Sequence, residues 1–60
     1  MLGEKVAGYA RALYESHGDK AEAEAAQKMA AAEEAGKTDE VEQWRAVREA
    51  VRALRGANQG

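Results

Sequence analysis

The side chains that could do chemistry in this 60-residue sequence are one histidine, eleven carboxylates and a row of arginines. His17 is the only imidazole, and the absence of cysteine excludes a disulfide, a thiolate zinc site and a cysteine nucleophile. An imidazole can act as a general base or as a ligand of haem or a metal ion. However, the nearest acids, Glu15 and Asp19, do not stand three or four residues away, where a helix would place them beside the ring. We therefore interpret His17 as a structural residue in the last turn of a helix, where a partial positive charge is favourable.

The carboxylates occur in groups, as at Glu33–Glu34 and around Asp39, Glu40 and Glu42. Paired acids serve glycoside hydrolysis or divalent-cation binding, but both need a concave and partly dry site. A short alanine-rich chain can hardly enclose such a site, so we interpret these acids as solvated helix surface. The glycines are scattered and form no phosphate-binding loop. We therefore expect no enzyme, no catalytic residue, no cofactor, no metal ligand and no small-molecule substrate.

Four arginines recur at spacings of three, four and three residues, which places them along one edge of a helix: Arg45, Arg48, Arg52 and Arg55. Residues 1–42 carry a net charge of −5 and residues 43–60 a net charge of +3. The arginines can suit the negative end of the helix dipole and pair with Glu42 and Glu49, which is the interpretation we favour. They can also meet the acidic surface of the preceding helix, in the same chain or another copy. A third possibility is contact with the phosphates of nucleic acid or an anionic membrane, although the net charge of −2 disfavours nucleic acid as a partner.

The composition predicts helices. Alanine fills 15 of the 60 positions, whereas isoleucine, phenylalanine and proline are absent. Alanine, glutamate, arginine and lysine are among the strongest helix formers, because they lose little side-chain entropy in a helix. We therefore predict an all-α chain.

Two glycines divide the chain into segments. Gly18 and Gly36 suit the left-handed conformation that ends a helix. Asp19 follows the first glycine and Thr38–Asp39 follow the second, and each aspartate precedes a glutamate by three residues, which is typical of a capping box. We predict helices at about residues 3–17, 19–35 and 39–55, in a single domain over residues 1–55, with a flexible C-terminal tail at 56–60.

The apolar residues of the first and third segments each fall on one face of a helix. The middle segment differs because its small residues form two stripes about 140° apart, the first Ala21, Ala25, Met29 and Ala32 and the second Ala23, Ala26 and Ala30. We therefore expect this helix to lie in the centre, in contact with both neighbours. The residues expected to form the core or a shared interface are Tyr9, Leu13, Met29, Trp44, Val47, Val51 and Leu54.

Short connections between the segments predict that consecutive helices are antiparallel. Two arrangements stay open, a small three-helix bundle and a helical hairpin with the remaining helix as an arm. The large apolar residues number only twelve, and small chains commonly complete their cores by oligomerising or by docking onto a partner. We therefore expect a protein partner, either further copies of this chain or a larger complex.

The segments MLGEKVAGYARALYESHGDKAEAEAA and WRAVREAVRALRGANQG resemble those of short, uncharacterised alphaproteobacterial helical proteins. The resemblance implies a bacterial, cytoplasmic setting and no particular activity. The chain has no apolar run near the roughly 20 residues that cross a membrane, and its N-terminus lacks the apolar core of a secretory signal. We expect a cytoplasmic protein without a membrane span.

Together these features predict a small non-catalytic protein–protein interaction module or accessory subunit. It would self-associate or dock onto a larger assembly through the apolar faces of its first and third helices. The alternative is a small nucleic-acid-associated regulator that uses the arginine edge of the third helix.

Overall fold

A computed structural model describes the backbone of residues 2–59 and the side chains of residues 5–56. The chain forms three helices, α1 (Leu2–His17), α2 (Lys20–Glu34) and α3 (Thr38–Gln59), and the described residues contain no strand. The predicted all-α fold of three helices is confirmed. The third helix ends four residues later than the predicted boundary at 55, so that residues 56–59, expected in a tail, continue the helix. Gly56 does not end α3, because one glycine in a helix costs only about 1 kcal/mol relative to alanine.

Both predicted glycine stops have the expected left-handed backbone, with φ of 59° at Gly18 and 73° at Gly36. The amide of Gly18 donates to the carbonyl oxygen of Tyr14 at 2.7 Å. At the end of α2, the Gly36 amide donates to the Glu33 carbonyl at 3.1 Å and the Lys37 amide to the Ala32 carbonyl at 2.9 Å. This pair of bonds is a Schellman motif, which satisfies the last carbonyl groups of α2 and turns the chain toward α3.

The capping box expected at the start of α2 is absent. Asp19 already has helical dihedral angles, with φ of −63° and ψ of −20°, and its side chain makes no cap hydrogen bond. A capping residue normally has extended backbone, which a two-residue connection between α1 and α2 does not allow here. The carbonyl oxygen of Gly18 accepts from the Ala21 amide at 3.0 Å and so satisfies an amide that the aspartate would have capped.

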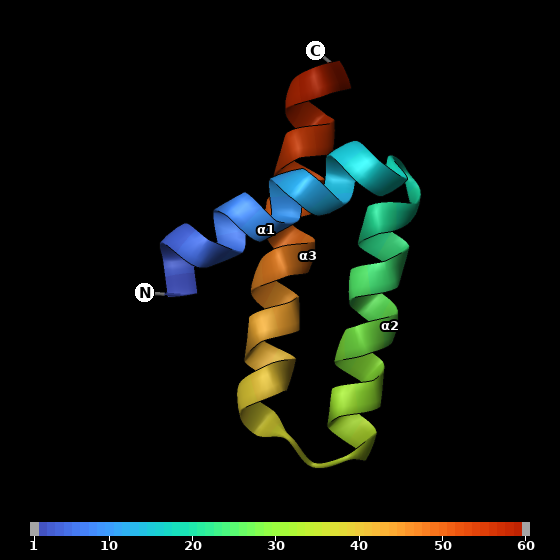
Figure 1. Cartoon of the computed structure of the whole chain (residues 1–60). Helices are drawn as coiled ribbons and strands as arrows, with labels where there is room; N and C mark the ends of the chain where they lie inside the picture. Colours follow the sequence, from blue (N-terminus) through green and yellow to red (C-terminus); the bar gives the residue numbers. More distant parts are fainter. Residues whose placement is uncertain (1, 60) are drawn as a thin grey trace.

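Helices α2 and α3 run antiparallel as a hairpin, and α1 lies across α3 (Figure 1). Contact is most extensive between α2 and α3, smaller between α1 and α3, and slight between α1 and α2. The three helices therefore pack together as a small bundle with α3 in its centre. Our expectation that α2 would be central is wrong, because α1 crosses onto α3 instead of lying beside the second alanine stripe of α2.

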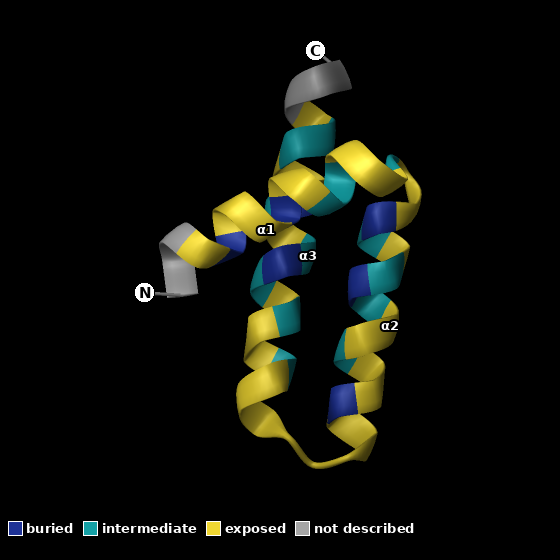
Figure 2. Ribbon diagram, viewed as in Figure 1, coloured by how far each residue is buried: buried dark blue, intermediate teal, exposed yellow. Residues whose placement is uncertain are grey.

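The core consists of small side chains that face inward from all three helices (Figure 2): Val6, Ala10, Ala21, Ala25, Val47 and Val51. Val51 is the largest fully buried side chain in the described part of the chain. Leu13, Tyr14 and Trp44 are partly buried against this cluster. The first alanine stripe of α2 thus packs against its neighbours, whereas Ala23 and Ala30 of the second stripe are exposed.

Candidate functional site

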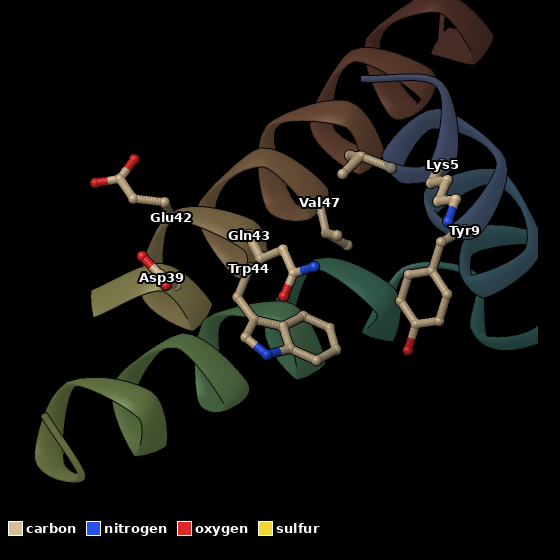
Figure 3. Close-up of a pocket in the computed structure, with 8 residues that line it drawn as sticks. Lys5, Tyr9, Asp39, Glu42, Gln43, Trp44 and Val47 are labelled. Carbon is tan, nitrogen blue, oxygen red and sulfur yellow. The ribbon is translucent and has the colours of Figure 1, made fainter. Parts of the chain in front are cut away.

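A groove lies between α1 and the first half of α3, with a cavity volume of about 710 Å³. It lies beside the crossing of α1 over α3 (Figure 1), and side chains of both helices line it (Figure 3). The residues that line it are Lys5, Val6 and Tyr9 from α1 and Asp39, Glu42, Gln43, Trp44 and Val47 from α3.

The inner part of the groove is apolar. Val6 and Val47 are buried at its base and belong to the core. The rings of Tyr9 and Trp44 stand 5.8 Å apart between centroids at an interplanar angle of 70°, an edge-to-face arrangement. Such a pair contributes about 0.5–1.5 kcal/mol beyond the area that it buries. Trp44 also packs on the core, so the aromatic wall formed by Tyr9 and Trp44 is held in place before any ligand arrives.

Among the large apolar side chains of the described residues, Tyr9 is the exposed one, with 49% of its surface accessible to solvent. A tyrosine carries a large apolar ring and a polar hydroxyl. It therefore suits a surface that is buried in a complex and exposed to solvent in the free protein. The aromatic wall is therefore both preorganised and uncovered.

The rim of the groove is charged, and its two ends carry opposite signs. Lys5 stands at the end formed by α1, and Asp39 and Glu42 stand at the end formed by the start of α3 (Figure 3). Glu42 also lies 3.9 Å from Arg45 Nη1, with both side chains more than half exposed, so that pair is weak.

Of the seven apolar residues predicted for the core or interface, the structure brings three together in the groove: Tyr9, Trp44 and Val47. Val51 lies in the core, and Leu13, Met29 and Leu54 are partly buried outside the groove. The charged rim was not predicted, because the residues that form it lie on two different helices. Lys5 and Asp39 come together only through the crossing of α1 over α3.

The arginine edge of α3 mostly meets acids of the same chain. Nη1 of Arg55 donates to Glu22 Oε1 at 2.7 Å, and Arg48 Nε lies 3.8 Å from Glu22 Oε2. Arg55 Nε lies 3.8 Å from Asp19 Oδ1 but has no hydrogen-bond partner. The interpretation that this edge meets the acidic surface of the preceding helix therefore applies to Arg48 and Arg55.

The remaining two arginines differ from this pair. Arg45 pairs within α3 with Glu42, as our favoured interpretation expected. Arg52 makes no ion pair with any described residue and borders a shallow depression with Glu22, Arg55 and Gly56. The edge therefore presents fewer free charges than its sequence spacing suggests.

His17 has a partner that sequence spacing did not reveal. Its Nδ1 lies 2.9 Å from Glu24 Oε2, across the turn between α1 and α2, and both side chains are partly exposed. The two residues are seven positions apart, so only the reversal of the chain at Gly18 brings them together. The contact joins the end of α1 to the first turns of α2, in keeping with a structural role.

Over the described residues, no group of three or more His, Cys, Asp or Glu side chains could hold a metal ion. In the same part of the chain, no helix combines the length and apolar character needed to cross a bilayer. Comparisons with protein families, with curated proteins and with solved structures found no match. The groove between α1 and α3 is consequently the feature from which a function can be argued.

Proposed function

We propose that this chain is a small non-catalytic protein–protein interaction module, or accessory subunit, that binds a polypeptide in the groove between α1 and α3. The observation that carries the proposal is the edge-to-face pair of Tyr9 and Trp44, with Tyr9 half open to solvent above a buried valine base. Tyrosine and tryptophan are among the residue types most enriched where protein complexes gain their binding energy.

The dimensions of the molecule support a role in a complex. The chain exposes 4317 Å², whereas a compact monomeric protein of 6.4 kDa exposes about 3,800 Å². Its extents of 37 × 24 × 17 Å describe an elongated shape rather than a sphere. Since the buried core is alanine and valine, a partner that covers the aromatic wall adds apolar burial that the chain alone lacks.

An elongated polypeptide, such as a helix that lays its apolar face into a groove, suits this site better than a small molecule. The groove is open to solvent and shaped by two helix faces, while small-molecule sites usually enclose most of their ligand. The alternative of a nucleic-acid-associated regulator has less support, because Glu22 lies against Arg48 and Arg55 and offsets part of their charge.

The proposal is tested by site-specific photo-crosslinking in extracts of the native cell and with the purified chain. Gln43, on the groove rim, and Ala30, on the exposed face of α2, are each replaced by a photoreactive phenylalanine. We expect a protein adduct, with another polypeptide or with a second copy, from position 43 and none from position 30.

A third protein carries Tyr9→Gln together with the reactive group at position 43. We expect this chain to remain helical, because Tyr9 is half exposed and glutamine is a good helix former, and to lose the adduct. Equal crosslinking from positions 43 and 30, or no adduct from either, would show that the groove is not a binding surface.

A further inference from the structure

We infer that the occupant of the groove is a second copy of this chain, bound around a two-fold axis that passes through the groove. The inference rests on the proposed function and names the partner for that site. Two properties of the molecule carry it: the opposite charges at the two ends of the groove and the exposed aromatic wall.

The charges on the rim complement their own copy. Lys5 stands at one end of the groove and Asp39 and Glu42 stand at the other (Figure 3). A two-fold axis perpendicular to the length of the groove reverses one copy relative to the other, so that Lys5 of each copy faces Asp39 and Glu42 of its mate. A groove whose rim carried charges of a single sign would instead repel its own copy.

The apolar wall complements its own copy as well. The two-fold axis brings Tyr9 and Trp44 of one chain against Trp44 and Tyr9 of the other, which forms a cluster of four rings. Aromatic rings favour offset or edge-to-face contact, and the rings of one chain already stand at 70° with the edge of the wall open. Pairing covers the exposed half of both tyrosines in one step.

The surface area is compatible with such a pair. A standard interface hides about 800 Å² on each partner. That area is about a fifth of the 4317 Å² that this chain exposes, so a pair leaves most of each copy open to solvent. The net charge of −2 per chain adds little repulsion between two copies.

The test exploits the symmetry of the proposed pair. Sedimentation velocity over a micromolar concentration series measures the dimer dissociation constant of the wild type, of Lys5→Glu and of Asp39→Lys/Glu42→Lys. Each variant opposes like charges at both ends of its own dimer, and we expect each dissociation constant to rise at least about tenfold, equivalent to about 1.4 kcal/mol.

An equimolar mixture of the two variants gives the decisive result. In the mixed pair, the acid introduced at position 5 of one chain faces the two lysines introduced in the other. At the opposite end, the unchanged Lys5 of the second chain faces Asp39 and Glu42 of the first. We therefore expect a one-to-one heterodimer with affinity within about threefold of the wild type.

A matched control pair changes charges outside the groove. Lys28→Glu and Glu33→Lys/Glu34→Lys alter exposed residues of α2 that do not line it, and each should leave the wild-type dissociation constant unchanged. Circular dichroism establishes that each variant is helical. Lys5→Glu places an acid near the start of α1, where the helix dipole favours it, so this variant tests the inference even if the lysine double variant is less stable.

A wild type that stays monomeric throughout the series, or a dimer that the groove charges do not affect, overturns the inference. The proposed function survives that outcome if position 43 still crosslinks to a different polypeptide, and fails with it if position 43 crosslinks to nothing.

Discussion

Glu22 is the side chain whose replacement should affect the stability of the fold most sharply among the charged residues. It is only 18% exposed, it accepts a 2.7 Å hydrogen bond from Arg55, and Arg48 lies 3.8 Å away on the same carboxylate. These contacts join the first turn of α2 to the second half of α3. Glu22→Gln keeps the shape and one oxygen of the side chain but removes its charge.

The expected cost follows from the burial of the pair. A hydrogen bond to a charged group contributes about 1.5–3 kcal/mol, and partial exposure of Arg55 to solvent places this one at the lower end, near 1.5 kcal/mol. For a chain of this length, 1 kcal/mol shifts the melting temperature by about 4–8 °C, so Glu22→Gln should lower it by about 6–12 °C. Thermal unfolding followed by circular dichroism at one fixed protein concentration measures the change, because the melting temperature of a self-associating chain depends on concentration.

Glu49→Gln is the matched control, because Glu49 is an exposed carboxylate of α3 that does not line the groove. That replacement should cost only about 0.3 kcal/mol. A double-mutant cycle between Glu22→Gln and Arg55→Gln should give a coupling energy of about 1 kcal/mol. If Glu22→Gln melts within about 2 °C of the wild type, or costs no more than Glu49→Gln, then the contact between α2 and α3 does not have the strength that its geometry implies.

Five further replacements test the backbone and the core, each by thermal unfolding. Asp19→Ala should cost less than about 0.5 kcal/mol, whereas loss of a functioning helix cap costs about 1 kcal/mol, and that larger loss would contradict the absence of a cap bond. Gly36→Ala should destabilise the fold by about 1–2 kcal/mol, because the φ of Gly36 is 73°. Gly8→Ala should stabilise it by about 1 kcal/mol, because Gly8 lies within a helix and the added methyl group meets no atom within 4 Å. A change of the same sign for both would contradict the left-handed backbone of Gly36 and the helical backbone of Gly8. Ala25→Val should cost about 1–3 kcal/mol through overpacking and Ala23→Val only about 0.5 kcal/mol; equal costs would mean that both stripes of α2 are packed.

The features that the sequence predicted well depend on neighbouring residues. Gly18 and Gly36 were correctly predicted to end helices, because the left-handed conformation at a helix end is a local property of the backbone that glycine adopts readily. Ala21 and Ala25 share one face of α2, as their spacing of four residues predicts. Both predictions hold wherever the helices later pack.

The features that the sequence could not reveal depend on how the helices pack against one another. The hydrogen bond of Glu22 to Arg55, the central position of α3 and the opposed charges of Lys5 and Asp39 all follow from that packing. The two alanine stripes of α2 present similar small faces, so spacing alone did not show which of them a neighbour would cover. The groove was missed for the same reason, since side chains of two different helices line it.

The central position of α3 also determines when the chain can fold during its synthesis. Helix α3 is the last of the three to be made, and α1 and α2 have little contact with each other in its absence. A ribosome that adds about 5–20 residues per second needs about 1–4 s to make the 22 residues of α3. Small helical domains complete their folding in microseconds to milliseconds. The inner faces of α1 and α2 therefore cannot be covered by α3 before its synthesis is complete, and the speed of the ribosome, not the speed of packing, sets the earliest time at which this protein can acquire its structure.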